Sequence, residues 1–151
     1  IKKFFLIMKK ILISGCAGFI GFHLSKDLSK EFEIIGIDSF ENKKFSNIAY
    51  DRIRELKKKE NFMFKKINIS DYKKLDSIFK KNKFYAVINL AATAGVRPSF
   101  TNPDIYFKNN LLGFYNIYLL SIKNRVNLFL FGSSSSVYGN NKNFNTDNPI
   151  S

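Results

Sequence analysis

Short apolar runs alternate along this chain with segments whose apolar residues recur every three or four positions. The first pattern is typical of strands that are buried on both faces, and the second is typical of helices with one apolar side. In Phe19–Lys30, for example, Ile20, Leu24 and Leu28 share one side of a predicted helix. The predicted strands are Ile11–Ser14, Glu33–Asp38, Phe62–Ile69, Tyr85–Ala91 and Asn127–Phe131, and the predicted helices are Phe19–Lys30, Ile48–Lys59, Tyr72–Lys81 and Pro103–Asn124.

The order of these elements predicts the fold class. Strands that alternate with helices form a parallel sheet covered on both faces. The 151 residues suit one domain, and a hydrophobic content of 45%, with 17 Phe, is enough to fill a core. We therefore expect a doubly wound α/β domain with about five parallel strands and a sheet that is incomplete at the C-terminus. Asn102, followed by Pro103, is expected to cap the long fourth helix.

Three glycines separate the first predicted strand from the first predicted helix. Gly15, Gly18 and Gly21 allow a tight turn, a close approach of the backbone to a pyrophosphate, and close packing of the helix on the strand. The helix N-terminus, at Phe19 and Ile20, offers unpaired N–H groups and a positive dipole to an anion. Because the spacing is G-x-x-G-x-x-G and not G-x-G-x-x-G, a plain loop that begins a helix is the alternative interpretation.

Asp38 ends the second predicted strand, 23 residues after Gly15. A carboxylate about 20 residues beyond a glycine loop is typical of dinucleotide-binding folds, where it binds the ribose hydroxyls of the adenosine. A carboxylate in this position repels the 2′-phosphate of NADP. The glycine loop and Asp38, with Ser39 beside it, therefore predict NAD as the cofactor.

The charge of the chain raises a competing interpretation. The net charge of +13 comes with 25 basic residues, of which only four are Arg, and the Lys residues are spread as doublets and triplets. Direct base recognition favours Arg, and a nucleic-acid site gathers basic residues on one face. The 17 Asn and 18 Ile indicate a general bias of composition instead. We expect no nucleic-acid partner, and keep a nucleic-acid-binding protein as a third hypothesis.

The sequence gives little support for a disulfide-stabilised, metal-binding, membrane or secreted protein. Cys16 is the only cysteine and His23 the only histidine, so we expect no internal disulfide and no metal site. No apolar run reaches the roughly 18 residues of a membrane span. The stretch Phe4–Met8 is too short for a signal peptide. We expect a cytoplasmic protein without a membrane partner.

A family resemblance is carried by three segments, ISGCAGFIGFHL, NLAATAGVRPS and FLFGSSSSVYG. Together they resemble the extended short-chain dehydrogenase/reductase family, and in particular its nucleotide-sugar epimerases and dehydratases. The second and third segments are similar to those of UDP-glucuronate 4-epimerases. The resemblance implies a Rossmann-type fold and a reaction in which bound NAD⁺ oxidises C4 of UDP-glucuronate and returns the hydride to the other face, giving UDP-galacturonate.

The resemblance also implies roles for particular residues. Ser134, after the fifth predicted strand, would hydrogen-bond the substrate O4, with Ser135 beside it. Arg97 and Ser99 would face the sugar nucleotide. Further cofactor contacts would come from Asn68, Ile69, Leu90, Ala91, Ala92, Asn109 and Asn110. There are alternative interpretations: Ser134 and Ser135 could belong to a simple polar loop, Arg97 could be a surface residue, and the amides of Asn109 and Asn110 could be structural.

The chain departs from the family pattern in two ways. At the position of Asn68 the family usually has Asp, and the carboxylate of that Asp meets the adenine amino group. In addition, Pro149–Ser151 resembles the start of a Pro-x-Ser-x-Tyr-x-x-x-Lys segment whose catalytic Tyr and Lys would follow the last residue. We expect residues 1–7 to be a non-native upstream extension and 8–151 to be a truncated NAD-binding domain without its C-terminal substrate domain.

The leading hypothesis is that the chain is the NAD-binding part of a UDP-glucuronate 4-epimerase that serves polysaccharide biosynthesis. We expect that these 151 residues alone do not turn over substrate. The rivals are a UDP-glucose 4-epimerase, a nucleotide-sugar 4,6-dehydratase and a non-catalytic NAD-binding module. The complete protein is expected to form a homodimer through the apolar Pro103–Asn124 helix, for which core packing is the alternative.

Overall fold

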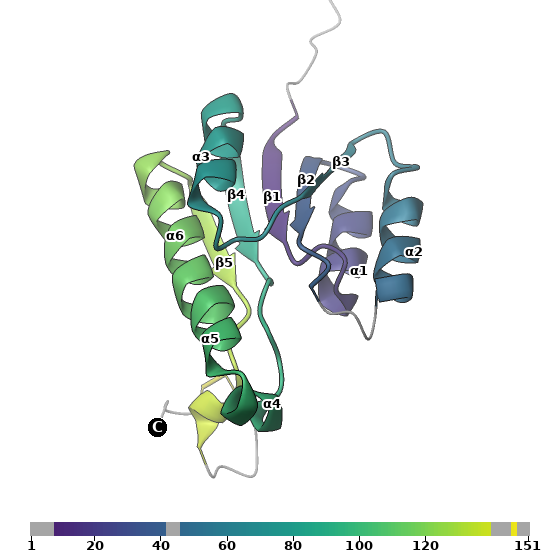
Figure 1. Cartoon of the computed structure of the whole chain (residues 1–151). Coiled ribbons are helices and arrows are strands. Elements are labelled where there is room, and N and C mark those ends of the chain that lie inside the picture. Colours follow the sequence, from purple (N-terminus) through teal and green to yellow (C-terminus); the bar gives the residue numbers. More distant parts are fainter. Residues whose placement is uncertain (1–7, 42–45, 140–145, 148–151) are drawn as a thin grey trace, which may run out of the picture.

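A parallel sheet of five strands forms the centre of the protein (Figure 1). The computed structural model describes residues 8–41, 46–139 and 146–147, so the expectations for residues 1–7 and 149–151 lie outside the described part. The strands lie in the order β3-β2-β1-β4-β5. Their bounds are Lys10–Ser14 for β1, Glu33–Asp38 for β2, Phe62–Lys66 for β3, Phe84–Asn89 for β4 and Leu128–Phe131 for β5. The predicted doubly wound Rossmann-type fold is confirmed.

Helices cover both faces of this sheet (Figure 1). Helices α1 (Phe19–Leu28) and α2 (Ser46–Leu56) lie on one face, and α3 (Tyr72–Lys81) and α6 (Gly113–Lys123) lie on the other. Because side chains alternate along a strand, β1 contributes to both cores. Ile11 and Ile13 pack on the α1 side, and Leu12 packs on the α6 side. The central strands β1, β2 and β4 are therefore buried on both faces, which explains their continuous apolar runs, whereas the edge strands β3 and β5 are partly exposed.

The order of the strands creates a point of reversal. The chain moves outward from β1 through β2 to β3, then returns to the other side of β1 with β4 and β5. The loops that follow β1 and β4 therefore leave the sheet in opposite directions. Ligands of open α/β sheets bind outside the carboxyl ends of the strands at such a point.

The predicted helix over Pro103–Asn124 is confirmed to within one residue, but it is not α-helical throughout. The structure has a short unpredicted helix, α4 (Val96–Thr101), then α5 (Pro103–Tyr106), a π-helical segment η2 (Phe107–Leu112) and α6. The Asn102 side chain does not cap α5. Asn102 instead ends α4, with its N–H donating to Pro98 O, and its Nδ2 donates to Thr101 Oγ1.

Two strands end earlier than predicted. β3 ends at Lys66 and not at Ile69, because Asn68 Oδ1 accepts a hydrogen bond from Ser70 N and turns the chain. β4 ends at Asn89 and not at Ala91. Helix α1 ends at Leu28, two residues early, and α2 spans Ser46–Leu56, two residues before the predicted start and three before the predicted end.

No helix among the described residues is both long enough and apolar enough to cross a membrane.

Candidate functional site

Each of the five strands is followed by a segment that contains residues predicted for the site. Gly15 follows β1, Asp38 ends β2, Asn68 follows β3, Leu90 follows β4 and Ser134 follows β5. In a parallel sheet these loops lie at one edge, so the fold places at that edge residues that are up to 119 positions apart in the sequence. The edge is the carboxyl edge, as the prediction requires.

The glycine loop is built so closely that side chains are excluded. Gly15 has a φ of +72°, and a Cβ there would lie 2.8 Å from the backbone of Leu90 and Ala91. A Cβ on Gly21 would lie 2.2 Å from Gly15 O. A Cβ on Gly18 would lie 3.1 Å from the same oxygen. The loop therefore folds back on the start of α1 and packs against the backbone after β4, so closely that Gly15 and Gly21 leave no room for a side chain.

Helix α1 begins without any side chain that satisfies its first N–H groups. Its N-cap is Gly18, no side chain makes a capping hydrogen bond, and the first turn contains no acidic residue. Helix α3 differs, because Asp71 caps it by accepting from Lys74 N. Phe19 and Ile20, in the first turn of α1, are 68% and 64% exposed. This open, positive helix end suits an anionic group such as a pyrophosphate.

Asp38 holds the glycine loop from the tip of β2. Its Oδ2 accepts from Ala17 N at 3.1 Å, and its Oδ1 accepts from Phe40 N at 2.9 Å. Each carboxylate oxygen keeps further acceptor capacity for a ligand hydroxyl. Ser39 follows it and is half-buried.

Sequence reasoning missed Arg52, which contacts the same loop from α2. Its Nη1 donates to Ala17 O at 3.1 Å, so Asp38 and Arg52 bind the N–H and the C=O of one residue. The guanidinium also lies 5.8 Å from the centre of the Phe19 ring. Arg52 is one of only four arginines, a signal that could have drawn attention to it.

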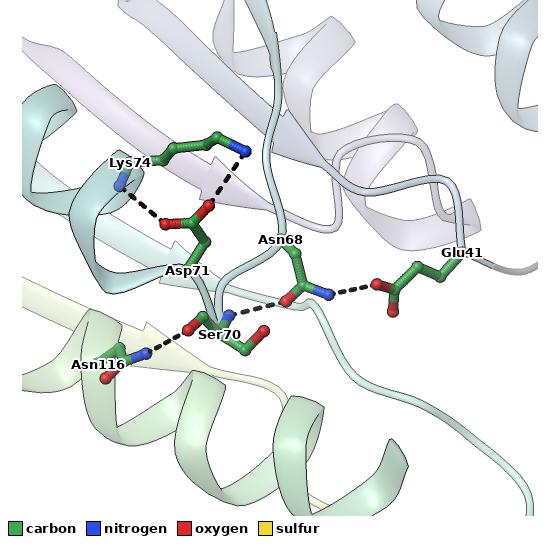
Figure 2. A network of polar contacts seen from close by, with 6 residues as sticks. All are labelled: Glu41, Asn68, Ser70, Asp71, Lys74 and Asn116. Carbon is green, nitrogen blue, oxygen red and sulfur yellow. Dashed lines mark hydrogen bonds and ion pairs between the residues drawn. The ribbon is translucent and has the colours of Figure 1, made fainter.

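A network of polar side chains links the loops after β2 and β3 (Figure 2). Asn68 Nδ2 donates to Glu41 Oε1 at 2.5 Å, and Asn68 Oδ1 accepts from Ser70 N at 2.7 Å. The carbonyl of Ser70 in turn accepts from Asn116 Nδ2 of α6 at 3.2 Å. Glu41 was also missed by sequence reasoning, since nothing in its local pattern marks it.

Ile69 is a core residue by its side chain. It is 4% exposed and packs against Gly113, at the start of α6, where a Cβ would lie 2.6 Å from Ile69 Cγ1. Its carbonyl accepts from Asn116 Nδ2 at 3.2 Å. Ile69 therefore anchors the loop after β3 on α6.

The two neighbouring amides of η2 have different surroundings. Asn109 is buried, and its Nδ2 donates to Glu41 Oε2 and to Thr93 Oγ1, both at 2.9 Å. Asn110 is exposed and binds the Thr93 backbone twice, accepting from its N at 2.7 Å and donating to its O at 2.9 Å. Asn110 thus holds the loop after β4, and Asn109 belongs to the Glu41 network.

The loop after β4 is fixed to β1 at its base. Leu90 N donates to Ser14 O at 3.1 Å, and Ala91 N donates to Ser14 Oγ at 3.3 Å. Ser14 Oγ in turn donates to the buried Asn89 Oδ1. Ala92, the next small residue, is exposed at the edge.

The residues predicted for the sugar nucleotide lie on short helical turns. Arg97 and Ser99 belong to α4; Arg97 is exposed, and Ser99 Oγ donates to Val96 O at 2.6 Å. Ser134 is the exposed N-cap of a 3₁₀ turn over Ser135–Tyr138, and its Oγ accepts from Ser136 N at 3.2 Å. The hydrogen bonds of Ser99 and Ser134 lie within their own turns, and the roles of Arg97, Ser99 and Ser134 toward the sugar nucleotide stay predictions.

Cys16 lies in the core, and His23 lies on the surface. Cys16 is fully buried, and burial together with the negative charge of Asp38 raises the pKa of its thiol well above the usual value. His23 is exposed and meets the rings of Phe19 and Phe22 edge-on. Among the described residues, no group of three His, Cys, Asp or Glu side chains could hold a metal ion.

Comparisons with known proteins identify the family. The model of the family described as GDP-mannose 4,6 dehydratase matches residues 12–150. Protein CapI of Staphylococcus aureus is 42% identical over 149 residues, which are 94% of this chain and 44% of CapI. The UDP-glucuronate 4-epimerase of Thermodesulfobacterium geofontis is 36% identical over 146 residues, 93% of this chain and 45% of that enzyme. UDP-glucose 4-epimerases are among the relatives too.

A solved structure agrees with this result. The UDP-glucuronic acid 4-epimerase of Bacillus cereus, in complex with UDP-glucuronic acid and NAD, superposes with a TM-score of 0.80 at 29% identity, covering 93% of this chain and 45% of that one. The chain spans less than half the length of these relatives. The sequence match to these relatives extends over nearly all residues of the chain, and the chain has the fold that the relatives share. The chain therefore belongs to the GDP-mannose 4,6 dehydratase family, the NAD-dependent nucleotide-sugar epimerases and dehydratases.

Proposed function

We propose that this chain is the NAD-binding part of a UDP-glucuronate 4-epimerase, which converts UDP-glucuronate to UDP-galacturonate. The observation that carries the proposal is the loop Gly15–Gly21, closed on itself by contacts that exclude side chains, beside a helix end with no capping side chain. The pyrophosphate of NAD would bind there. The ribose hydroxyls would bind Asp38, whose carboxylate already fixes the loop.

NAD would supply the hydride acceptor, and the residues of this chain would bind and orient it. The cofactor contacts that we propose are Gly15, Gly18, Phe19, Ile20, Gly21, Asp38, Ser39, Asn68, Ile69, Leu90, Ala91, Ala92, Asn109 and Asn110. Arg97 and Ser99 would bind the sugar nucleotide, and a guanidinium suits a carboxylate or a pyrophosphate because it can donate two parallel hydrogen bonds. Ser134, with Ser135, would orient the substrate O4, since a hydroxyl both donates and accepts.

The choice of UDP-glucuronate is supported by the identity with the Thermodesulfobacterium geofontis enzyme and by the likeness to the Bacillus cereus enzyme. We further propose that these 151 residues on their own bind NAD without turnover, because the Tyr and Lys of the Pro-x-Ser-x-Tyr-x-x-x-Lys segment implied by the family resemblance are not among them. The complete enzyme would act in the cytoplasm, in polysaccharide biosynthesis.

Two measurements test this proposal. Calorimetry of the 151-residue chain with NAD⁺ should show saturable binding, and its absence at millimolar NAD⁺ would remove the cofactor assignment. Proton NMR of UDP-glucuronate with the complete protein and NAD⁺ should show the appearance of UDP-galacturonate. If UDP-glucuronate stays unchanged, the substrate assignment is wrong.

The same experiment separates the alternatives. UDP-glucose 4-epimerases are also similar to this chain, so UDP-glucose and a deoxythymidine diphosphate glucose are included in the panel. Conversion of UDP-glucose to UDP-galactose would favour the first alternative, and loss of water from the 4,6 positions would favour a dehydratase. NAD⁺ binding with no turnover of any of these sugars by the complete protein would favour a non-catalytic module.

We also propose that the complete protein is a homodimer. Four exposed apolar residues of η2 and α6, Leu111, Tyr115, Tyr118 and Ile122, follow one another at spacings of four, three and four positions and so share one side of the helix. Such a stripe suits packing against its own copy. Light scattering after gel filtration should give twice the chain mass, and the double variant Leu111→Glu, Tyr115→Glu should give the monomer mass. A monomer before substitution would contradict the proposal.

A further inference from the structure

The loop after β2 contributes a second carboxylate to the candidate site. Glu41, three residues after Asp38, contacts the side-chain amides of Asn68 and Asn109 with its two oxygens, and Figure 2 shows the contact with Asn68. Oε1 lies 2.5 Å from Asn68 Nδ2, and Oε2 lies 2.9 Å from Asn109 Nδ2. Glu41 is exposed, whereas Asn109 is buried. The carboxylate is therefore the solvent-facing end of the network.

The side-chain oxygen of Asn68 is a neutral acceptor that keeps one of its two acceptor positions. Asn68 Oδ1 accepts from Ser70 N, and Asn68 Nδ2 donates both to Glu41 and, at 3.2 Å, to Asn109 Oδ1. Both amide hydrogens are thus in use. An ionised carboxylate has about four acceptor positions, and Glu41 uses two of them. The charged acceptor with unused capacity in this network is Glu41.

The covalent structure of a dinucleotide relates this carboxylate to the base. The phosphate is attached to C5′ of the ribose and the base to C1′, so the base lies beyond the ribose from the phosphate. With the pyrophosphate at Gly15–Gly21 and the ribose at Asp38, the base extends past Asp38 toward the loops after β2 and β3. Glu41 and Asn68 lie in those two loops and contact each other.

We propose that Glu41 recognises the adenine base of the cofactor, accepting a hydrogen bond from its exocyclic amino group. Asn68 and Asn109 hold the carboxylate in place by donating to it. This inference rests on the proposed NAD site and names the residue that selects the base within it. A hydrogen bond to a charged acceptor is about twice as strong as one between neutral groups, so Glu41 gives a marked preference for an amino group over a carbonyl oxygen.

The preference is measurable with two dinucleotides that differ only at C6 of the base and at the neighbouring N1, which carries a hydrogen in the second. NAD⁺ and its hypoxanthine analogue, in which a carbonyl replaces the adenine amino group, are titrated into the 151-residue chain by calorimetry. The unmodified chain should bind NAD⁺ about tenfold more tightly than the analogue. Glu41→Ala should reduce this ratio to about two or less, because the amino group loses its acceptor and the carbonyl group loses its repulsion.

Two further variants separate Glu41 from its neighbours. Glu31→Ala removes an exposed carboxylate that precedes β2, at the opposite edge of the sheet, and should keep the tenfold ratio. Asn68→Ala should weaken both dinucleotides and keep most of the ratio, since the carboxylate itself remains.

Several results would overturn the inference. One is an unchanged ratio in Glu41→Ala; another is a ratio lost in Asn68→Ala but kept in Glu41→Ala, which would make Asn68 the recognising residue. If the unchanged ratio came with an equal loss of affinity for both dinucleotides, Glu41 would have a purely structural role. These results leave the NAD site intact, whereas an unmodified chain that binds neither dinucleotide would refute the proposed function and this inference together.

Discussion

Asp38 and Ala17 are joined by a hydrogen bond from the Ala17 N–H to Asp38 Oδ2, with 3.1 Å between the two atoms. This bond ties the end of β2 to the glycine loop after β1, across 21 residues of sequence. The carboxylate that sequence reasoning assigned to the ribose therefore also shapes the loop expected to hold the pyrophosphate. A change at Asp38 should affect stability as well as binding.

Asp38→Asn is the sharpest test of this double role. Oδ1 accepts from Phe40 N and Oδ2 accepts from Ala17 N, but an amide has only one acceptor oxygen, so one N–H must lose its partner. We expect the free energy of unfolding to fall by about 1–2 kcal/mol and NAD⁺ affinity to fall at least about tenfold. Urea unfolding and calorimetry measure the two effects. Asp27→Asn, in an exposed pair with Lys30, is the control and should change neither quantity.

The glycines of the loop should differ in their tolerance of alanine. A Cβ on Gly21 would lie 2.2 Å from Gly15 O and 2.9 Å from Cys16 Cα, both backbone atoms that cannot rotate away. Gly21→Ala should therefore destabilise the chain by about 3 kcal/mol, although alanine is the better helix former. Gly18→Ala meets Gly15 O at 3.1 Å and should cost about 1 kcal/mol or less. Thermal unfolding followed by circular dichroism measures both, and equal effects would contradict the close packing of Gly21.

Gly113 should be coupled to Ile69. A Cβ on Gly113 would lie 2.6 Å from Ile69 Cγ1 and 2.8 Å from Cδ1, so Gly113→Ala should destabilise the chain by about 1–3 kcal/mol. Ile69→Ala alone leaves a cavity and should also be destabilising. In the double variant the new methyl group occupies part of that cavity, so the loss should be smaller than the sum of the single losses by about 1 kcal/mol. Additive losses would show that the two residues do not share this space.

The thiol of Cys16 should make the chain less stable in alkali. Burial, and then the negative charge of Asp38, raise the pKa of Cys16 above its ordinary value of 9.0. Above pH 9 the unfolded chain releases the thiol proton while the folded chain keeps it, so stability is lost as the pH rises. Between pH 8 and pH 10, the unmodified chain should lose about 1 kcal/mol more than Cys16→Ala. Urea unfolding at the two pH values checks this, and parallel losses in both proteins would be the contrary result.

Much of the fold follows from local sequence. The bounds of β2 and α3 agree with the prediction, because each has a clear apolar period of its own and α3 begins at a capping residue, Asp71. The position of the glycine loop between β1 and α1 follows for the same reason, as does the place of Asp38 at a strand end. These features depend on residues that are close neighbours in the chain.

The tertiary structure decided what the sequence pattern could not express. The predicted long helix contains a π-helical segment that coincides with the buried Asn109, and Asn102 ends α4 where a cap for the next helix was expected. The contacts of Glu41 with Asn68 and Asn109 join residues 27 and 68 positions apart, and Arg52 reaches Ala17 over 35. Burial imposes a period on strands and helices, which a sequence reveals. Contacts between polar loop side chains have no period, since they arise only when the packed sheet brings its carboxyl-edge loops together.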